Sequence, residues 1–584
     1  MSILDHHEFI HREAALGARP ADLVLSNCRM VNVLSGRIEE GASIAISGDR
    51  IVGIGDYSAA ESIDVKGQFV YPGLMDAHIH LESSKLTIPE CARAMNRCGT
   101  TGVVTDPHEI ANVASIEGIS YQLDSASGND RMSVFFTVPS CVPAIPDPEI
   151  ETFAAYMGPT KLRTFFNNPW FVVLGEMMNM PGAIYGDKKV LAKLADFHER
   201  GLPIDGHAPM LRGKELNTYV YLGIGSDHES TTREEAQEKL DRGMFVMIRE
   251  GSSESNLEEL LPLVNPLNAS RFMFASDDLD PVDLVERGHI NYAIRTAVAR
   301  GLDPIRALQM ASINVANYFR LPRVGAIYPG ALADLVISPD LENFWPSSVI
   351  RHGRFVIRDG VEQPVARKPV TFLRSMMNVS LPPLEALAVH SDRPRKMRCI
   401  DIIEQQIVTQ EGSVDANVAD GRVWPNIDQN LAKLCVFERH RNSGSFGVGF
   451  IRGLGLRRGA IASSVAHDSH NIIVAGVDDE SILRAASRVR DLGGGQVAVA
   501  GDAEACIPLP VAGLMSDAPF EEVVKQERAF TSFCRESLGS PLRSMAATLS
   551  FMALPVIPSL RLTDKGLVQV KAGQYPRRVG LFFD

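Results

Sequence analysis

The stretch from about residue 68 to residue 320 alternates short apolar, strand-like runs with segments of helical periodicity. The linking segments, such as DPIRALQMASINVANYF, repeat apolar residues at helical spacing. Eight strand-then-helix units over roughly 250 residues are typical of a (β/α)8 barrel. The runs are QFVYPGLMD (68–76), TGVVTD (101–106), SVFFTVP (133–139), FVVLGE (171–176), PIDGH (203–207), GIGSD (223–227), MFVMIRE (244–250) and RFMFASD (271–277).

Most of these runs end in, or just before, a side chain that can bind a metal or move a proton. In such a barrel the carboxyl ends of the strands and the loops after them form the active site. Chance would scatter His, Asp and Glu over the surface instead. The sequence therefore predicts one site at the barrel mouth, built from His78, His80, Asp106, His108, Glu176, His207, His228 and Asp277.

The segments on either side of the predicted barrel lack the alternation of strands and helices. Residues 22–67 and 331–358 contain short strands with Gly turns, so we predict that both build one β-sandwich beside the barrel. Residues 359–400 are predicted to be a linker, and strands near IASSVAH, NIIVAGV and GQVAVAG indicate a further α/β unit. The predicted class is α/β, with an N-terminal arm and first sandwich part (1–67), the catalytic barrel (68–320), a second sandwich part and linker (321–380) and a C-terminal α/β domain (381–584).

Composition excludes several classes of protein. With 45% hydrophobic and 22% charged residues, the chain is typical of a globular protein. A net charge of −13 argues against a broad nucleic-acid-binding surface. The eight cysteines form no CxxC pair, which argues against a zinc knuckle or a disulfide framework. No apolar run reaches the ~18 residues of a membrane span, and the start lacks a signal-peptide pattern. We expect a cytoplasmic protein without nucleic-acid or membrane partners.

Two of the strand ends carry groups that suit a metal ion. His78 and His80 follow the first barrel strand, where residues i and i+2 point to the same side. Two imidazoles so placed can bind one ion, although a solvated pair is the alternative. Glu176 ends an apolar strand, and its two carboxylate oxygens could bridge two cations, with helix capping as the alternative.

The later strand ends complete a ligand set. His207 and His228 end consecutive strands, and neutral imidazole binds Zn, Mn or Fe. Asp277 and Asp278 follow the last strand, where one carboxylate could act as general base, or both could cap the next helix. Four His, one Glu and one Asp suffice for two divalent metals, which lower the pKa of bound water towards ~7. The predicted reaction class is metal-assisted hydrolysis.

Several longer motifs resemble those of the bacterial adenine deaminase family, in the amidohydrolase superfamily. The resemblance covers nearly the whole chain, and DPHEIANV and GEMMNMPG are long and specific. The motifs are PGLMDAHIHLESS (72–84), GTTGVVTDPHEIANV (99–113), LGEMMNMPGAI (174–184), GHAPMLRGKELNTY (206–219), SDHESTTREEA (226–236), FASDDLDP (274–281) and VAHDSHNIIVAG (465–476).

This resemblance implies that adenine is hydrolysed to hypoxanthine and ammonia by a metal-bridging hydroxide that attacks purine C6. It implies two divalent ions per chain, with Mn or Fe favoured over Zn, and often a homo-oligomer. The catalytic candidates are Asp277, which would carry the proton to the leaving nitrogen, Glu176 and His228, and Asp278 would contact the purine. One metal would be bound by His78, His80, Glu176 and Asp277, and the other by Glu176, His207 and His228.

A second group of polar residues has several possible roles. They could shuttle protons, hold substrate or take an extra metal, or they could orient the ligands through hydrogen bonds. The C-terminal members either lie over the barrel mouth, in the same subunit or a neighbour, or form a polar turn. The group comprises Glu82, Ser83 and Ser84 after the histidine pair, Asp106, His108 and Glu109 in DPHE, and His467, Asp468 and His470 in HDSH.

Two departures from related enzymes narrow the prediction. Many relatives bridge two metals with a carboxylated Lys, whereas this strand end offers Glu176, which weakens a dihydroorotase or hydantoinase assignment. GHAPMLRG has no Glu close behind His207, unlike one-zinc nucleoside deaminases, and the cytidine deaminase signature is missing. The alternatives are an amidohydrolase for another aminopurine or cyclic amide, and a barrel that lost catalysis and serves in assembly. All six ligands are present, which argues against the latter.

Overall fold

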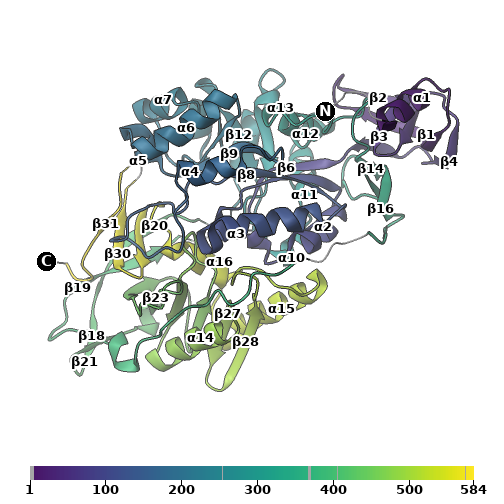
Figure 1. Ribbon diagram of the computed structural model, residues 1–584. Helices are drawn as coiled ribbons and strands as arrows, with labels where there is room; N and C mark the ends of the chain where they lie inside the picture. Colours follow the sequence, from purple (N-terminus) through teal and green to yellow (C-terminus); the bar gives the residue numbers. More distant parts are fainter. Residues whose placement is uncertain (1–5, 253, 366–369, 404–405, 572–573, 584) are drawn as a thin grey trace.

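The computed structural model describes residues 6–583, apart from 253, 366–369, 404–405 and 572–573. Figure 1 shows a sheet near the N-terminus, a central α/β part, and a separate lobe formed by the last third of the chain. We call residues 74–318 the parallel unit and residues 389–578 the C-terminal unit. Among the described residues, no helix combines the length and apolar character needed to cross a bilayer.

Each of the eight predicted runs overlaps a strand of the parallel unit. The strands form two parallel sheets, in the orders β10-β9-β8-β7-β6 and β11-β12-β13. Strands β6, β7, β8 and β13 are buried at every position, as expected of a sheet covered on both faces. The strands are β6 (Leu74–Ile79), β7 (Thr100–Thr105), β8 (Ser133–Val138), β9 (Phe171–Met177), β10 (Ile204–Gly206), β11 (Ser226–Asp227), β12 (Phe245–Arg249) and β13 (Phe272–Ala275).

The two parallel sheets curl around a shared interior. A parallel bridge between Ile79 and Asp277 links the end of β6 to the residues after β13. A Cβ added to Gly206 would lie 2.2 Å from the Ser226 carbonyl oxygen, so only glycine lets β10 approach β11 so closely. A buried apolar cluster draws from strands of both sheets and includes Met75, Val104, Phe135, Val173, Met247 and Met273.

Helices follow the parallel strands. The last predicted helical stretch divides into α12 (Pro304–Met310) and α13 (Ile313–Tyr318), because Ser312 leaves the helical conformation. The others are α2 (Ile88–Asn96), α3 (His108–Ser127), α4 (Pro159–Leu162), α5 (Met180–Tyr185), α6 (Lys188–Arg200), α7 (Gly213–Tyr221), α8 (Arg233–Asp241), α9 (Leu257–Leu260), α10 (Pro281–Glu286) and α11 (Ile290–Ala299).

The two flanks of the parallel unit combine in one nine-stranded sheet, in the order β17-β16-β15-β14-β5-β1-β2-β3, with β4 beside β1. The first predicted barrel run divides at Gly73. Its first half, β5 (Phe69–Pro72), pairs with β14 (Leu335–Ser338) in this sheet, and only its second half, in β6, pairs with β7. Apolar character alone does not specify the sheet that a strand joins. The remaining elements are α1 (His6–Ala15), β1 (Ala21–Asn32), β2 (Arg37–Ser47), β3 (Arg50–Ile54), β4 (Ala59–Asp64), β15 (Ser348–Arg351), β16 (Arg354–Arg358) and β17 (Val361–Glu362).

The C-terminal unit is built on an eight-stranded sheet, in the order β20-β19-β24-β23-β26-β25-β27-β28. The three predicted strands are β25 (Ala460–Ser463), β26 (Ile472–Gly476) and β27 (Gly495–Ala500). Strand β19 (Lys396–Ile402) begins inside the predicted linker. The other elements are β18 (Val389–His390), β20 (Thr409–Asp415), β21 (Asn417–Ala419), β22 (Arg422–Trp424), β23 (Leu431–Phe437), β24 (Phe446–Arg452), α14 (Asp479–Asp491), β28 (Ala503–Pro508), α15 (Phe520–Phe533), α16 (Met545–Ser550), β29 (Ser559–Thr563), β30 (Gly566–Val570) and β31 (Arg577–Arg578).

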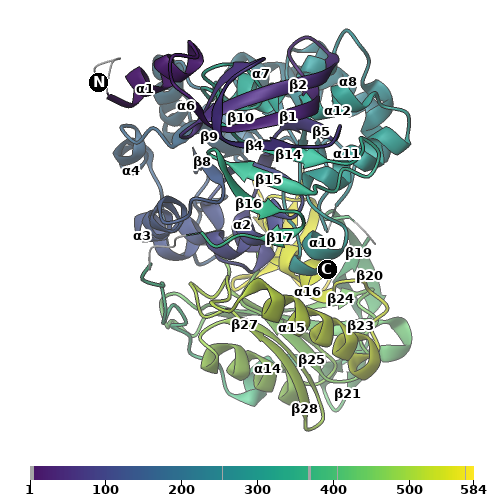
Figure 2. The same ribbon diagram turned by 90° about the vertical axis from the view of Figure 1, so that its right-hand side faces the viewer.

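The C-terminal unit lies against the parallel unit, as both ribbon views show (Figures 1 and 2). Polar contacts between the two units are buried. The Lys85 Nζ donates to Glu527 Oε2 at 2.5 Å, and the Thr152 hydroxyl donates to Asp564 Oδ2 at 2.7 Å. Glu109, at the start of α3, contacts two histidines of the C-terminal unit. The C-terminal unit therefore covers the end of the parallel unit where the polar strand ends lie.

Candidate metal centre

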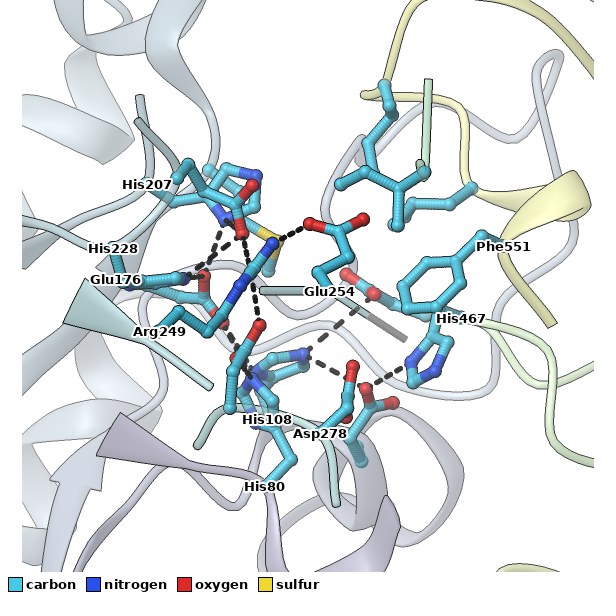
Figure 3. A pocket seen from close by; sticks show the side chains of 18 residues that line it. His80, His108, Glu176, His207, His228, Arg249, Glu254, Asp278, His467 and Phe551 are labelled. Atoms are coloured by element: carbon cyan, nitrogen blue, oxygen red, sulfur yellow. Dashed lines mark hydrogen bonds and ion pairs between the residues drawn. The ribbon is translucent and has the colours of Figure 1, made fainter. Parts of the chain in front are cut away.

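The six predicted metal ligands come together in one buried cluster. His78 lies on β6, Glu176 on β9, and the others follow their strands within two residues. Each is at most 8% exposed. Figure 3 shows His80, Glu176, His207 and His228 facing one another on one side of a cavity. The cluster comprises His78, His80, Glu176, His207, His228 and Asp277.

Glu176 occupies the middle of this cluster. Its Oε1 lies 3.2 Å from His80 Nε2, while its Oε2 lies 2.7 Å from His207 Nδ1 and 3.4 Å from His228 Nε2. One carboxylate thus faces two groups of imidazoles with different oxygens. The backbone of Glu176 is held by Asp106, because the Glu176 N–H donates to Asp106 Oδ2 at 3.2 Å. This arrangement suits a carboxylate that bridges two cations.

Asp277 faces the histidine pair of β6. Its Oδ1 lies 3.4 Å from His78 Nε2 and 3.2 Å from His80 Nε2, and the two Nε2 atoms are 3.3 Å apart. Asp277 has a φ of 59°, in the left-handed region, and is held by backbone hydrogen bonds to both histidines. The N-cap of α10 is instead Asp280, whose side chain accepts from the Val282 N–H. Helix capping therefore does not account for Asp277.

Two aspartates that the sequence analysis missed support the histidine pair. Asp76 accepts from the His78 and Ser276 N–H groups at 3.1 and 3.2 Å, which ties β6 to the residues after β13. His289 Nε2 lies 2.8 Å from Asp76 Oδ2. Asp205 Oδ2 lies 3.8 Å from His78 Nδ1. Both aspartates occupy strands, Asp76 on β6 and Asp205 on β10, so they lie behind the strand ends on which the predictions concentrated.

Attraction between imidazoles and carboxylates shifts the pKa values of the central groups despite burial. Burial alone would lower the pKa of His78, but Asp205, Asp277 and Glu176 raise it to about 10. Burial alone would raise the pKa of Glu176, yet His207 and the other imidazoles hold that pKa well below its usual range. The carboxylates are therefore anionic at neutral pH, which is the form that binds a cation.

The donor atoms fit a divalent cation. His207 Nε2 and both ring nitrogens of His228 are buried without a hydrogen-bond partner among the described residues. Nitrogen and carboxylate donors within 4.8 Å of one another form the groups His78–His80–Asp277 and His78–Glu176–His228. Imidazole and carboxylate are ligands that first-row divalent metals accept. A buried polar atom without a partner is costly unless another ligand satisfies it.

A buried arginine, also missed from the sequence, bridges acidic residues at the cavity. Arg249 Nη1 lies 2.5 Å from Glu229 Oε1 and 2.5 Å from Asp277 Oδ2, and its other terminal nitrogen contacts Glu254. Arg249 is the last residue of β12, inside the seventh predicted run. Its position at the end of a predicted strand is the sequence signal that marks it as a candidate.

Removing this arginine is expected to destabilise the protein. Arg249→Met leaves Glu229 and Glu254 as buried carboxylates without their cation, so the free energy of unfolding in urea should fall by about 3–5 kcal/mol. The control is Arg163→Met, because Arg163 is 55% exposed in its pair with Asp196 and should cost about 0–1 kcal/mol. Equal losses in the two variants would contradict this assignment.

The polar residues of the LESS, DPHE and HDSH segments fall into two sets. Some line the cavity, and the others lie behind its wall. His108 Nδ1 lies 3.4 Å from Glu176 Oε1, and its Nε2 lies 3.8 Å from Asp468 Oδ1. Behind the wall, the Glu82 carboxylate accepts from the Ile110 N–H and the Ser83 hydroxyl donates to the His80 carbonyl. Ser84, Asp106 and His470 are also buried behind the wall. The members that line the cavity are His108, Glu109, His467 and Asp468, together with Asp278.

Comparison with known proteins agrees with this geometry. Residues 69–356 match the amidohydrolase family, and residues 406–574 match the adenine deaminase C-terminal domain. The adenine deaminase of Desulfatibacillum aliphaticivorans is 44% identical and covers 95% of this chain and 97% of its own length. Adenine deaminase 2 of Carboxydothermus hydrogenoformans is 43% identical, and the match covers 96% of this chain and 97% of that protein. Amidohydrolases carry a divalent metal centre, which the donor set fits. The chain therefore belongs to the adenine deaminase family of amidohydrolases.

Proposed function

We propose that this protein hydrolyses adenine to hypoxanthine and ammonia. The observation that carries the proposal is the cluster around Glu176. Two imidazoles from the end of β6, one imidazole after each of β10 and β11, and the carboxylate of Asp277 after β13 gather around this central carboxylate. The similarity to adenine deaminases over 95% of the chain supports adenine as the substrate.

The proposed ligand assignment follows the two faces of Glu176. His78, His80, Glu176 and Asp277 would hold one divalent cation, and Glu176, His207 and His228 would hold the other. Mn or Fe is the favoured metal and Zn the alternative, because this nitrogen and oxygen donor set accepts all three. Such a centre supplies a water whose pKa is lowered towards about 7.

The chain's own residues then move the proton and orient the reaction. Asp277 accepts one proton of the attacking water as the water oxygen bonds to purine C6, and it passes that proton to the amino nitrogen. The C6–N bond to the amino group then breaks and ammonia leaves, while the second proton of the water ends on ring N1 of hypoxanthine. Arg249, 2.5 Å from Asp277 Oδ2, holds the carboxylate in place. Glu176 and His228 fix the position of the reacting water. Asp278 would contact the purine, and its buried Oδ1, which has no hydrogen-bond partner among the described residues, supports this role.

We also propose that the parallel unit is a closed (β/α)8 barrel. Its eight strands, their shared apolar interior and the bridge between Ile79 and Asp277 support this reading. The predicted division into domains is 1–67, 68–320, 321–380 and 381–584. We propose to keep it except for its first boundary, which moves to Gly73 because β5 pairs with the flanking sheet. The flanks would form a small β-sandwich.

The direct test is ammonia release from adenine. Protein stripped of metal by a chelator should be inactive, and reloading with Mn(II) or Fe(II) should restore conversion to hypoxanthine. If the protein binds two metals per chain but turns over no adenine with Mn, Fe or Zn, the adenine assignment is wrong. A panel of other aminopurines and cyclic amides would then identify the substrate.

A further inference from the structure

We propose that the C-terminal unit forms the wall against which the purine packs, with Phe551 and His467 as its contact surface. This inference rests on the proposed deaminase function and adds the residues that bind the base. It assigns part of the substrate site to the C-terminal unit, far in sequence from the metal ligands.

The cavity has one polar side and one apolar side. The parallel unit supplies the charged side, and Met178 is its one apolar side chain among the described residues that line the cavity. The C-terminal unit supplies four apolar side chains, Ile407, Phe551, Leu554 and Ile557. A purine needs a flat apolar or aromatic surface for its ring faces, since bases stack on aromatic side chains. The C-terminal side of the cavity provides that surface.

Phe551 and His467 form a parallel ring pair at this wall. Their ring centroids are 4.6 Å apart and their planes differ by 19°. Figure 3 shows both rings across the cavity from Glu176 and His207. A purine placed with C6 towards the metal ligands would extend towards these rings. Stacked and offset aromatic arrangements of this kind are favourable.

The position of the ring pair is fixed from the parallel unit by Glu109. Its two carboxylate oxygens contact His467 Nδ1 and His470 Nε2, across a separation of 358 residues for the first contact. His470 Nδ1 accepts from the Ala466 N–H at 3.2 Å, so the ring proton lies on Nε2 and is donated to Glu109. A metal at Nε2 would need the lone pair there. Glu109 therefore holds the HDSH loop (residues 467–470) in position by hydrogen bonds, and the three side chains do not form a third metal site.

Phe551 lies at the boundary between the small cavity at the metal-ligand candidates and a larger cavity. The cavity among the ligands has a volume of about 30 Å³, room for about two waters and too little for a purine. An adjoining cavity between the two units has a volume of about 640 Å³. Glu254, Ile407 and Phe551 line both cavities. A purine that passes from the larger cavity to the metal ligands must therefore contact or displace the Phe551 side chain.

The test compares two matched ring deletions. Phe551→Leu keeps an apolar side chain but removes the stacking face, and it should raise the KM for adenine about tenfold, with kcat and bound metal within about twofold of wild type. The Kd for hypoxanthine, measured by calorimetry, should rise by a similar factor. Phe446→Leu, which removes another paired ring of the C-terminal unit, should change neither. Phe551→Tyr retains the ring and should restore near-normal KM.

The outcomes separate this inference from the function on which it rests. A wild-type protein that deaminates adenine, with unchanged KM and Kd in a folded Phe551→Leu variant, would overturn the wall assignment alone. A wild-type protein that does not act on adenine would overturn both. If Phe551→Leu does not fold, Glu109→Gln provides the second test. An amide cannot accept from both imidazoles, so KM should rise while kcat stays near wild type, and an unchanged KM would again overturn the assignment.

Discussion

Replacing Glu176 by glutamine is expected to abolish most of the activity and to release metal. The carboxylate presents one oxygen to His80 and the other to His207 and His228. An amide is neutral and keeps only one acceptor, so it cannot serve both sides. Metal-ion catalysis is worth several kcal/mol and each ~1.4 kcal/mol is tenfold in rate, so kcat/KM should fall by about 10³-fold. Bound metal, measured by atomic emission, should fall to one ion or fewer per chain.

A control separates loss of the metal centre from general loss of a buried charge. Glu235 is as buried as Glu176, at 3% exposed, but it pairs with Lys239 and not with imidazoles. Glu235→Gln should lower the thermal midpoint while leaving two metals bound. A Glu176→Gln variant that keeps both metals and more than a tenth of the wild-type activity would refute the bridging role.

Asp277→Asn is expected to lower kcat by about 10²–10⁴-fold, the range for loss of a positioned general base. Asparagine is the suitable replacement because it tolerates the left-handed backbone that Asp277 adopts, at a φ of 59°. The variant can therefore keep its backbone hydrogen bonds to His78 and His80 while it loses the ability to accept a proton. The measurement is steady-state ammonia release, with circular dichroism to confirm folding.

The neighbouring residue provides the sharpest comparison for this prediction. Asp278 Oδ1 has no hydrogen-bond partner among the described residues, and Asp278 lines the cavity. Asp278→Asn should therefore act mainly on KM, with kcat within about tenfold of wild type. The remote buried Asp479, paired with Lys433, gives a neutral reference for activity as Asp479→Asn. The reverse pattern, with kcat lost in Asp278→Asn and kept in Asp277→Asn, would exchange the two roles.

The sequence by itself determined those features of the site that depend on residues close together in the chain. Strand periodicity and the strand-end rule pointed to the residues that meet in the buried cluster, and the family motifs favoured Asp277 over Asp278. The i, i+2 rule placed His78 and His80 on one side of the chain, with their Nε2 atoms 3.3 Å apart. The motifs also identified the family before any geometry was known. These features depend on a few neighbouring residues, whose conformations are dictated by nearby backbone and side-chain chemistry.

Only the tertiary structure decided the features that join distant segments. It separated Asp277, which faces the histidines, from Asp280, which caps α10. It brought Arg249 between Glu229 and Asp277, and it joined Glu109 to His467 across 358 residues. Such contacts arise because buried charges must find partners and apolar surfaces must be covered, wherever the partner lies in the sequence. Periodicity carries no information about which remote segment will supply that partner.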